Sequence, residues 1–325
     1  MQIQSWNIFY QNAQCGEKMN GLLIYEKEDA IKNEWFINEL IRIAKGYDIL
    51  LRLIYLEDIC FDSLNEIASI NGEPVSFCIN RSRNSDISCA LSDLSIRQFN
   101  CTGIIEIAND KGKTYDFLSR NNIPCLEYVQ FDLDTEDVFS TKEKAITILQ
   151  RKFGVSDISN LFPLVVKPSH GHGGNGVAKA DDIDTLIDCI LHMKEIWPHE
   201  ESVIIQKCAR TIGRDLRIYI IDGTILSCVM RSSASGELCA NFSLGGKCEL
   251  HALAKEEQRL SDEILRILDN NSMHPDFIGI DLIYDDGNPV FNEIEDAVGS
   301  RMLYQLTDLD VAELFISHIA SVIAG

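Results

Sequence analysis

The sequence predicts a mixed α/β (α+β) fold in which helices cover several sheets. Short apolar segments rich in valine, isoleucine and leucine recur along all 325 residues, and segments with apolar residues at helical spacing lie between them. The chain is 46% hydrophobic and 24% charged, a composition typical of a globular protein with more than one core. It contains no tandem repeat and no low-complexity segment.

The first third of the chain has the order strand, helix, strand, which indicates a parallel α/β unit. We therefore expect an N-terminal parallel α/β domain over residues 1–108. Its predicted elements are strands at 21–25, 49–55, 75–79 and 103–107 and helices at 30–45 and 86–99.

The remaining two thirds also mix strands and helices, and we expect a central domain at 109–209 and a C-terminal domain at 210–325. The central domain has predicted helices at 113–121, 142–153 and 182–196, and strands just after 124 and at 164–166, 177–179 and 202–206. The C-terminal domain has predicted strands at 216–221, 224–230, 278–284 and 289–294, and helices at 255–270 and 309–324.

The chain is strongly acidic, with 29 basic and 50 acidic residues and a net charge of −21 at neutral pH. This charge repels nucleic-acid phosphates and anionic lipids, so we expect neither nucleic acid nor a membrane as a partner. Residues 1–16 lack a basic segment followed by an apolar run, and no apolar stretch reaches membrane-spanning length. We therefore expect a soluble protein of the cytoplasm.

Eleven cysteines are scattered along the chain, and none belongs to a Cys-x-x-Cys pair. Several lie in apolar stretches such as residues 227–230. We expect them to be small buried hydrophobic residues of a protein in a reducing compartment.

A glycine-rich loop follows an apolar strand that ends at Lys167. Glycine lets the backbone approach an anion and point several N–H groups at it, and the lysine adds a positive charge. The lysine precedes the glycines and a predicted strand follows them, so the order fits neither a P-loop nor a dinucleotide-binding motif. It predicts a β-hairpin lid over phosphates; the alternative is a turn without a ligand. The glycines are Gly171, Gly173, Gly174 and Gly176.

Three acidic residues lie on two adjacent predicted strands. Glu293 and Glu295 are two residues apart and so share a strand face, and Asp281 lies in the strand before them. Three converging carboxylates need a counter-ion, and oxygen ligands beside phosphates suit magnesium. The alternative is a solvated face of two exposed strands.

Together these segments resemble the ATP-grasp superfamily, and most closely its RimK-like (alpha-L-glutamate ligase type) carboxylate–amine ligases. The likeness runs from about residue 21 to the C-terminus. It implies an ATP-grasp fold preceded by a pre-ATP-grasp domain. The matching segments, in order, are 109–111, 165–176, 213–217, 231–246, 279–282 and 292–295.

The resemblance implies that Lys111 and Lys167 hold the α- and β-phosphates of ATP while the glycine loop closes over the triphosphate. The backbone around Gln206 and Lys207 would contact the adenine. A polar contact, to the ribose or elsewhere in the site, would come from Asp215.

The resemblance also implies a reaction centre. Arg217 and Arg231 would face the transferred phosphate or the substrate carboxylate, with Asn241 beside them. Two magnesium ions, or manganese in their place, would bind to Asp281, Glu293 and Glu295.

The chain departs from the family pattern at three places. Glu295 replaces the usual asparagine, which adds a charge that should still coordinate magnesium. Lys207 stands where an acidic residue is usual. Residues 296–301 differ from the family's usual sequence in a region that shapes the acceptor pocket, so the resemblance does not identify the substrates.

The predicted activity is ATP-dependent ligation of a carboxylate to an amine through an acyl phosphate, with an amino acid, peptide or protein tail as a substrate and homo-oligomers as in much of the family. A kinase on the same site, or a nucleotide-binding module without turnover, is the alternative. We expect His170 and His172 to contribute backbone alone rather than act as general bases. Arg301 is expected either to bind an acceptor carboxylate or to form a surface salt bridge.

Overall fold

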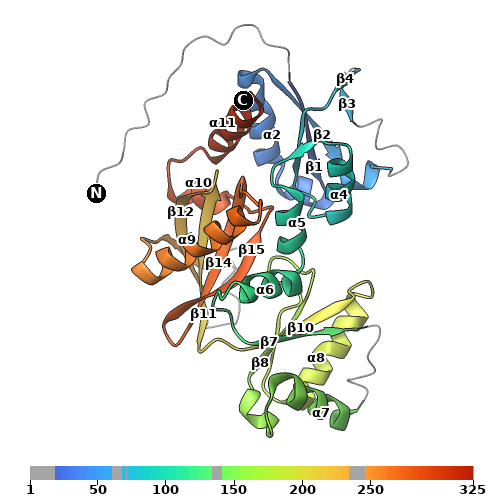
Figure 1. Cartoon of the computed structure of the whole chain (residues 1–325), viewed down its shortest axis with the longest axis vertical. Helices are drawn as coiled ribbons and strands as arrows, with labels where there is room; N and C mark the ends of the chain where they lie inside the picture. Colours follow the sequence, from blue (N-terminus) through green and yellow to red (C-terminus); the bar gives the residue numbers. More distant parts are fainter. Residues whose placement is uncertain (1–18, 61–67, 71, 134–140, 234–245, 325) are drawn as a thin grey trace.

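The computed structural model describes residues 19–60, 68–70, 72–133, 141–233 and 246–324. Three large sheets with helices packed against them account for most of this part of the chain, and a two-stranded sheet is formed by β3 (Ser69–Ile70) and β4 (Glu73–Pro74) (Figure 1). Within the described ranges, three short 3-10 helices connect other elements: η1 (Lys45–Tyr47), η2 (Leu56–Asp58) and η5 (Ile158–Leu161).

The N-terminal sheet is parallel throughout, with the strand order β2-β1-β5-β6. Apolar side chains alternate along its central strand, so that Leu23 and Tyr25 pack on one face and Leu22 and Ile24 on the other. Helices cover both faces, which confirms the predicted parallel α/β unit (Figure 1). The elements are β1 (Met19–Tyr25), α1 (Lys27–Lys32), α2 (Glu34–Ala44), β2 (Ile49–Tyr55), β5 (Phe77–Asn80), α4 (Ser85–Asp93) and β6 (Arg97–Gln98).

The predicted strand at 103–107 was wrong, because these residues belong to the helix α5 (Thr102–Ala108). Ile104, Ile105 and Ala108 are buried along one side of it, a spacing of one and four residues that fits a helix. A short apolar run does not distinguish a strand from a buried helix turn. The helix predicted at 86–99 ends earlier, at Asp93, and strand β6 follows it.

The second sheet is antiparallel and lies at the lower end of the molecule in Figure 1, with the order β7-β10-β8-β9. Two amphipathic helices pack apolar side chains such as Leu149 and Leu186 against it. Its elements are β7 (Tyr128–Asp132), α7 (Lys142–Phe153), β8 (Leu164–Pro168), β9 (Ala178–Ala180), α8 (Ile183–Ile196) and β10 (Ser202–Lys207). The sequence predicted each of these helices and strands, with ends that agree to within a few residues.

The third sheet is antiparallel, with the order β13-β12-β11-β14-β15. Its elements are β11 (Thr211–Ile221), β12 (Thr224–Ser232), β13 (Lys247–Leu250), α9 (Lys255–Asn270), β14 (Phe277–Asp285) and β15 (Asn288–Glu295). One face, with Ile218 and Ile280, is buried under α9, α5 and α6 (Lys111–Arg120).

The other face of the third sheet is covered at one end only. Tyr219 and Val229 pack there with residues of α10 (Arg301–Leu306) and α11 (Val311–Ala324), and α11 also packs against α2. The rest of this face carries charged side chains and borders the second sheet (Figure 1). Elements β13 and α10 were not predicted, and the domain boundaries after residues 108 and 209 stay predictions.

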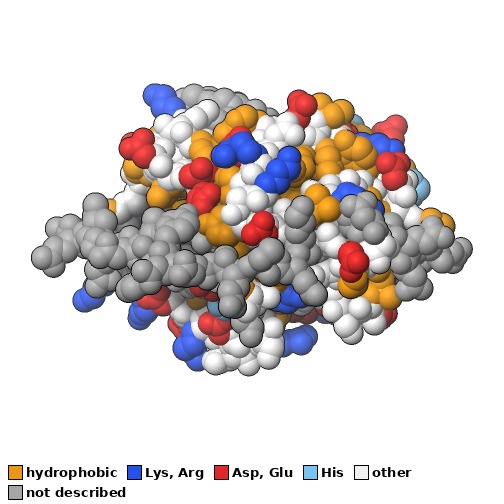
Figure 2. Space-filling model, turned by 90° about the horizontal axis from the view of Figure 1, so that it is seen from above, with side chains coloured by type: hydrophobic (Ala, Val, Ile, Leu, Met, Phe, Trp, Pro, Cys, Tyr) orange, Lys and Arg blue, Asp and Glu red, His pale blue; other side chains and the backbone are white. Residues whose placement is uncertain are grey.

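Charges of both signs are interspersed on the upper surface: Figure 2 shows blue and red side chains scattered among apolar ones in the part that grey atoms leave visible. Of the nine cysteines in the described ranges, only Cys78 and Cys228 are buried, while Cys60 and Cys89 are exposed, so the expectation of uniformly buried thiols was wrong. Within those ranges, no helix combines the length and apolarity needed to cross a membrane.

Candidate active site

The predicted site residues of the third sheet share the face that the helices leave open. Alternation along β11 places Asp215 and Arg217 on this face, and the paired strand β14 adds Asp281 at the position opposite Arg217. The intervening residues Leu216 and Leu282 point into the core. The alternation thus fixes the backbone position of each charged side chain, because its neighbours in the strand are buried in the core.

A β-bulge adjusts the last strand at this point. The register of β14 and β15 shifts after Asp281, which pairs with Glu293, while Leu282 pairs with Phe291. Asn292 is therefore an extra residue in β15. The bulge keeps Phe291 in the core while Glu293 and Glu295 lie on the open side.

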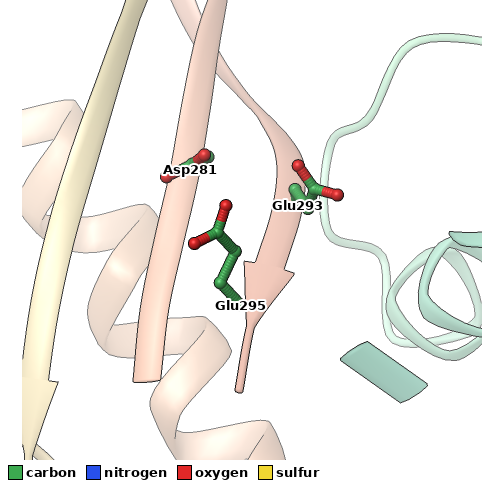
Figure 3. A group of neighbouring side chains, drawn as sticks. All are labelled: Asp281, Glu293 and Glu295. Atoms are coloured by element: carbon green, nitrogen blue, oxygen red, sulfur yellow. The ribbon is translucent and has the colours of Figure 1, made fainter. Parts of the chain in front are cut away.

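The acidic trio converges as predicted. Asp281, Glu293 and Glu295 each offer a carboxylate oxygen, and these atoms lie within 4.8 Å of one another. Figure 3 shows the Glu295 side chain on β15 pointing toward Asp281 on β14. Oxygens bound to one Mg²⁺ lie about 2.1 Å from it, hence up to about 4.2 Å apart. The trio therefore fits one ion after a small side-chain movement, or two ions that share the carboxylates.

Two buried arginines neutralise the innermost carboxylate. Arg217 donates from Nε to Oδ1 of Asp281 over 2.8 Å and from Nη2 to Oδ2 over 2.7 Å, and Arg231 donates to Oδ2 over 2.7 Å. Burial alone would raise the pKa of Asp281, but the two guanidinium groups lower it to about 2. Arg217 also donates to Glu295 over 2.6 Å.

The other carboxylates of the site are paired as well. Nε of Arg231 donates to Asp215, whose pKa is nevertheless raised by burial. Lys111 lies 3.1 Å from Glu293, and although burial opposes it, this lysine lowers the pKa of Glu293. The three carboxylates were expected to need a counter-ion, and cations of the chain itself supply part of that positive charge.

The glycine loop lies on the opposite side of this space. Lys111 Nζ donates to the carbonyl of Gly171, which ties the loop to the carboxylate side. Gly173 has a φ of 64°, a conformation that side chains with a Cβ rarely adopt. Gly176 lies outside the cavity lining, and its hydrogen faces Trp197, where a Cβ would come within 2.7 Å of the ring.

Tyr115 is a site residue that the sequence did not reveal. Its hydroxyl accepts a hydrogen bond from Lys167 Nζ over 2.5 Å and donates to the Asn292 carbonyl over 2.9 Å. Burial raises the pKa of Tyr115, so the hydroxyl stays protonated and can fill both roles. Its position in α6, 52 residues before Lys167, gives no local sequence signal.

A single cavity connects these groups, with a volume of about 950 Å³ including space open to solvent. Its lining residues come from β8 and the glycine loop, from β10, and from strands of the third sheet. Those predicted from the sequence are Lys111, Lys167, Gly171, Gly173, Gly174, Gln206, Lys207, Asp215, Arg231, Asp281, Glu293 and Glu295. Arg217 lies behind this lining, buried against Asp281, and Asn241 lies outside the described residues.

The side chain of Lys207, at the end of β10, is paired with an acidic residue. Lys207 Nζ forms an ion pair with Glu127, a residue that sequence reasoning missed. The Glu127 side chain is 48% exposed and lies outside the cavity lining. Gln206 is buried and donates to the Leu126 carbonyl over 3.3 Å.

The two histidines and Arg301 make side-chain interactions. His170 Nδ1 lies 2.9 Å from Glu200, whose carboxylate raises the pKa of His170. Burial, together with the charges of Arg83 and Lys111, lowers the pKa of His172 to about 3. Arg301 Nη2 donates to the Lys32 carbonyl over 3.0 Å, and it forms no salt bridge with a described residue.

Residues 135–291 match the family model of the prokaryotic glutathione synthetase ATP-grasp domain. The chain is 26% identical over 303 residues to an uncharacterized protein of Mycoplasma genitalium, covering 92% of each chain. It is also 26% identical to a probable alpha-L-glutamate ligase of Shewanella pealeana, over 71% of this chain but only 46% of that relative.

The fold is also that of a solved ligase. The D-alanine–D-alanine ligase of Bacillus anthracis, complexed with ATP, superposes with a TM-score of 0.68 and 19% identity over 94% of this chain and 97% of that one. The matched range includes Lys167, the glycine loop and Asp281 of the cavity described above, but not Lys111, Glu293 or Glu295. The chain therefore has the ATP-grasp fold, and its residues 135–291 are similar to the ATP-grasp domain of prokaryotic glutathione synthetases.

Proposed function

We propose that the chain is an ATP-dependent, RimK-like carboxylate–amine ligase. The supporting observation is one cavity that has two lysines and a glycine loop, groups suited to phosphate, on one wall and, on the other, three carboxylates next to two buried arginines. The name of the Shewanella pealeana relative, a probable alpha-L-glutamate ligase, fits this class of reaction. The proposal places the protein in the cytoplasm, with ATP, an acid and an amine as substrates.

The charge balance of the site favours a triphosphate with magnesium. Four cationic side chains, Lys111, Lys167, Arg217 and Arg231, face four carboxylates, those of Asp215, Asp281, Glu293 and Glu295. Two further cations, Lys207 and Arg214, also line the cavity. A triphosphate adds about four negative charges, which exceeds this surplus of two, so it requires additional cations. Magnesium, or manganese, held by Asp281, Glu293 and Glu295 would supply them and polarise the γ-phosphate.

The chain's own groups would then orient two successive displacements. In the first, an oxygen of the acid attacks the γ-phosphorus, the bond to the β-phosphate oxygen breaks, and ADP and an acyl phosphate result. In the second, the amine nitrogen attacks the acyl carbon, the C–N bond forms, inorganic phosphate leaves and the amine loses a proton. Arg231 lines the cavity and would stabilise charge on the phosphoryl oxygens, while Lys167 would bind the β-phosphate.

Arg217 is better suited to a positioning role. It is buried behind Asp281 and donates to both Asp281 and Glu295, so it fixes two of the three carboxylates relative to each other. Tyr115 plays the corresponding part for Lys167. We propose that these two residues hold the site in shape for a substrate complex.

The test is a screen of acid and amine pairs for amine-dependent ADP release, with hydroxylamine as a trap for the acyl phosphate. We expect an active acid to yield a hydroxamate and its amine partner to yield an amide with free phosphate. A stable phosphorylated product, or turnover that gives no hydroxamate with any active acid, would reject the ligase in favour of a kinase. Absence of any turnover would reject both.

A further inference from the structure

Both ends of the glycine loop contact one short segment, residues 197–201, which joins α8 to β10 and which we name the α8–β10 connection. The end of β8 pairs with the start of β10 in the antiparallel second sheet, so the chain leaves β8 next to the place where it enters β10. At the first end of the loop, His170 contacts Glu200. At the other end, Gly176 lies against the ring of Trp197. The connection therefore holds the loop at both ends.

Glu200 is the central residue of this contact. Only 7% of its side chain is exposed. Its Oε2 accepts from the backbone N–H of His170 over 3.3 Å, and its Oε1 lies 2.9 Å from His170 Nδ1 and accepts from the Ser202 N–H over 3.4 Å. One buried carboxylate thus joins the loop to the first residue of β10, and these donors replace the water that burial removes from it.

The ring of His170 lies between carboxylates. Its Nδ1 faces Glu200, and its Nε2 lies 3.9 Å from Oδ2 of Asp110, the residue before α6. A carboxylate only accepts hydrogen bonds, whereas a neutral imidazole has a single N–H, so only the protonated ring can direct an N–H at both sides. The hydrogen bond with Glu200 raises the pKa of His170 despite partial burial, and the charges of Glu200, Asp110 and Glu201 act in the same direction. The contact is thus strongest when His170 is protonated.

Asp110 connects this contact to Lys111, which we expect to hold phosphate. Its Oδ1 accepts from the Gly112 N–H over 2.9 Å, at the start of α6, and from Ser169 Oγ over 3.2 Å. The backbone N–H of Lys111 donates to the Ser169 carbonyl over 3.0 Å, and Lys111 Nζ donates to the carbonyl of Gly171. A displacement of the first residues of the loop would therefore move Lys111 as well.

We propose that Glu200 is a positioning residue of the nucleotide site, which acts through His170 to fix the glycine loop over the phosphates of ATP; this inference rests on the proposed ATP-dependent function. Neither residue lines the cavity, so we expect neither to touch the nucleotide. The pair would change how tightly the phosphates are held rather than the transfer step, so KM for ATP should respond to its loss while kcat changes little.

The proposal predicts that the affinity for MgATP depends on the protonation of His170. The pKa of His170 is raised above the 6.5 of an ordinary histidine, so the ring is mostly protonated at pH 6.5 and loses its proton as the pH rises further. The contribution of the pair to MgATP binding is therefore present at pH 6.5 and decreases as the pH rises through this pKa. His172, in the same loop, does not titrate in this range, because its pKa is about 3.

Isothermal titration of the full chain with MgATP measures this affinity without requiring turnover. Glu200→Gln and His170→Gln each remove one charge of the pair, and we expect the Kd for MgATP at pH 6.5 to rise about tenfold, the loss typical of a charge-assisted hydrogen bond. The difference from wild type should narrow as the pH rises, because wild-type His170 then loses its proton. The double variant should bind no more weakly than either single variant. Glu195→Gln, which alters an exposed pair with His192 on α8, is the matched control and should leave the Kd unchanged.

The outcomes separate the positioning role from the ligase assignment. An unchanged Kd in folded Glu200→Gln and His170→Gln, an equal loss in Glu195→Gln, or a difference from wild type that stays constant with pH would overturn the proposal. Cooperative urea unfolding checks that the buried substitution in Glu200→Gln leaves the chain folded, and His170→Gln, at a half-exposed side chain, is the second test. MgATP binding that responds to both variants without amide formation would reject the ligase and keep the positioning role. Hydroxamate formation with an unchanged KM for ATP in both variants would reject the positioning role and keep the ligase.

Discussion

Arg217 and Asp281 form a bidentate ion pair between adjacent strands, at directly opposed positions of β11 and β14. Both side chains are buried, with 7% and 3% of their side-chain surface exposed. The same guanidinium also reaches Glu295, so one residue orients two of the three carboxylates proposed to bind metal. Because the pair is desolvated, its geometry matters more than that of a surface pair.

Arg217→Lys should therefore impair the site although it keeps the charge. Lysine cannot donate in parallel to both oxygens of Asp281, so we expect kcat for ADP release to fall at least about 100-fold and the free energy of unfolding to fall by about 2 kcal/mol. Turnover and urea unfolding measure the two effects. The matched control is Arg210→Lys, which alters an exposed bidentate pair with Asp285 and should change stability by less than about 0.5 kcal/mol. Similar losses in both variants would contradict the special role of the buried pair.

Glu293→Gln should abolish turnover while leaving the protein folded. The substitution removes one carboxylate from the acidic trio and the charge partner of Lys111, but an amide of the same size still fits the strand. Magnesium titration of ADP release, with circular dichroism for the fold, tests this expectation. Glu263→Gln, on the exposed side of α9, serves as control. Undiminished activity in Glu293→Gln would refute the metal assignment.

Local periodicity predicted most of the strands and the face that carries the site. Apolar alternation placed Asp281 beside Glu293 because their neighbours Ile280 and Ile294 must be buried. It could not predict the bulge at Asn292, since an extra residue changes the register without changing the apolar pattern.

The sequence pattern could not predict which residues from distant segments contact each other. Tyr115 in α6 and Glu127 before β7 look like ordinary helix and loop residues. Only the fold brings Tyr115 to Lys167 in β8, and the pairing of β7 with β10 brings Glu127 to Lys207. The helix at 102–108 shows the same limit, because its burial between other elements, rather than its own composition, decides its conformation.

Tyr115→Phe should weaken ATP binding without unfolding the chain. It removes only the hydroxyl that accepts from Lys167 and donates to Asn292, so the lysine keeps its charge but loses its fixed position. We expect KM for ATP to rise about tenfold, the loss typical of one hydrogen bond to a charged group. Steady-state ADP release over a range of ATP concentrations measures it. Tyr47→Phe removes a hydroxyl that bonds Glu313 on α11 and should leave KM unchanged; an equal effect in the two variants would rule out a role for Tyr115 in the site.

His172 should make the folded protein less stable as the pH falls below 6.5. Burial and the nearby charges of Arg83 and Lys111 lower its pKa to about 3 in the folded state, whereas an unfolded histidine titrates near 6.5. Between these values the unfolded chain binds a proton that the folded chain does not, so the free energy of unfolding decreases with decreasing pH.

The expected loss from His172 is about 1.5 kcal/mol between pH 6.5 and pH 5. Glu200 raises the pKa of His170, which acts in the opposite direction, so the wild-type curve alone does not isolate the effect. The difference between wild type and His172→Asn in urea unfolding at each pH does isolate it, and His199→Asn, at an exposed position, is the control. A pH-independent difference between wild type and His172→Asn would mean that His172 takes up a proton in the folded chain, and that its side chain is not held in a buried, positively charged environment.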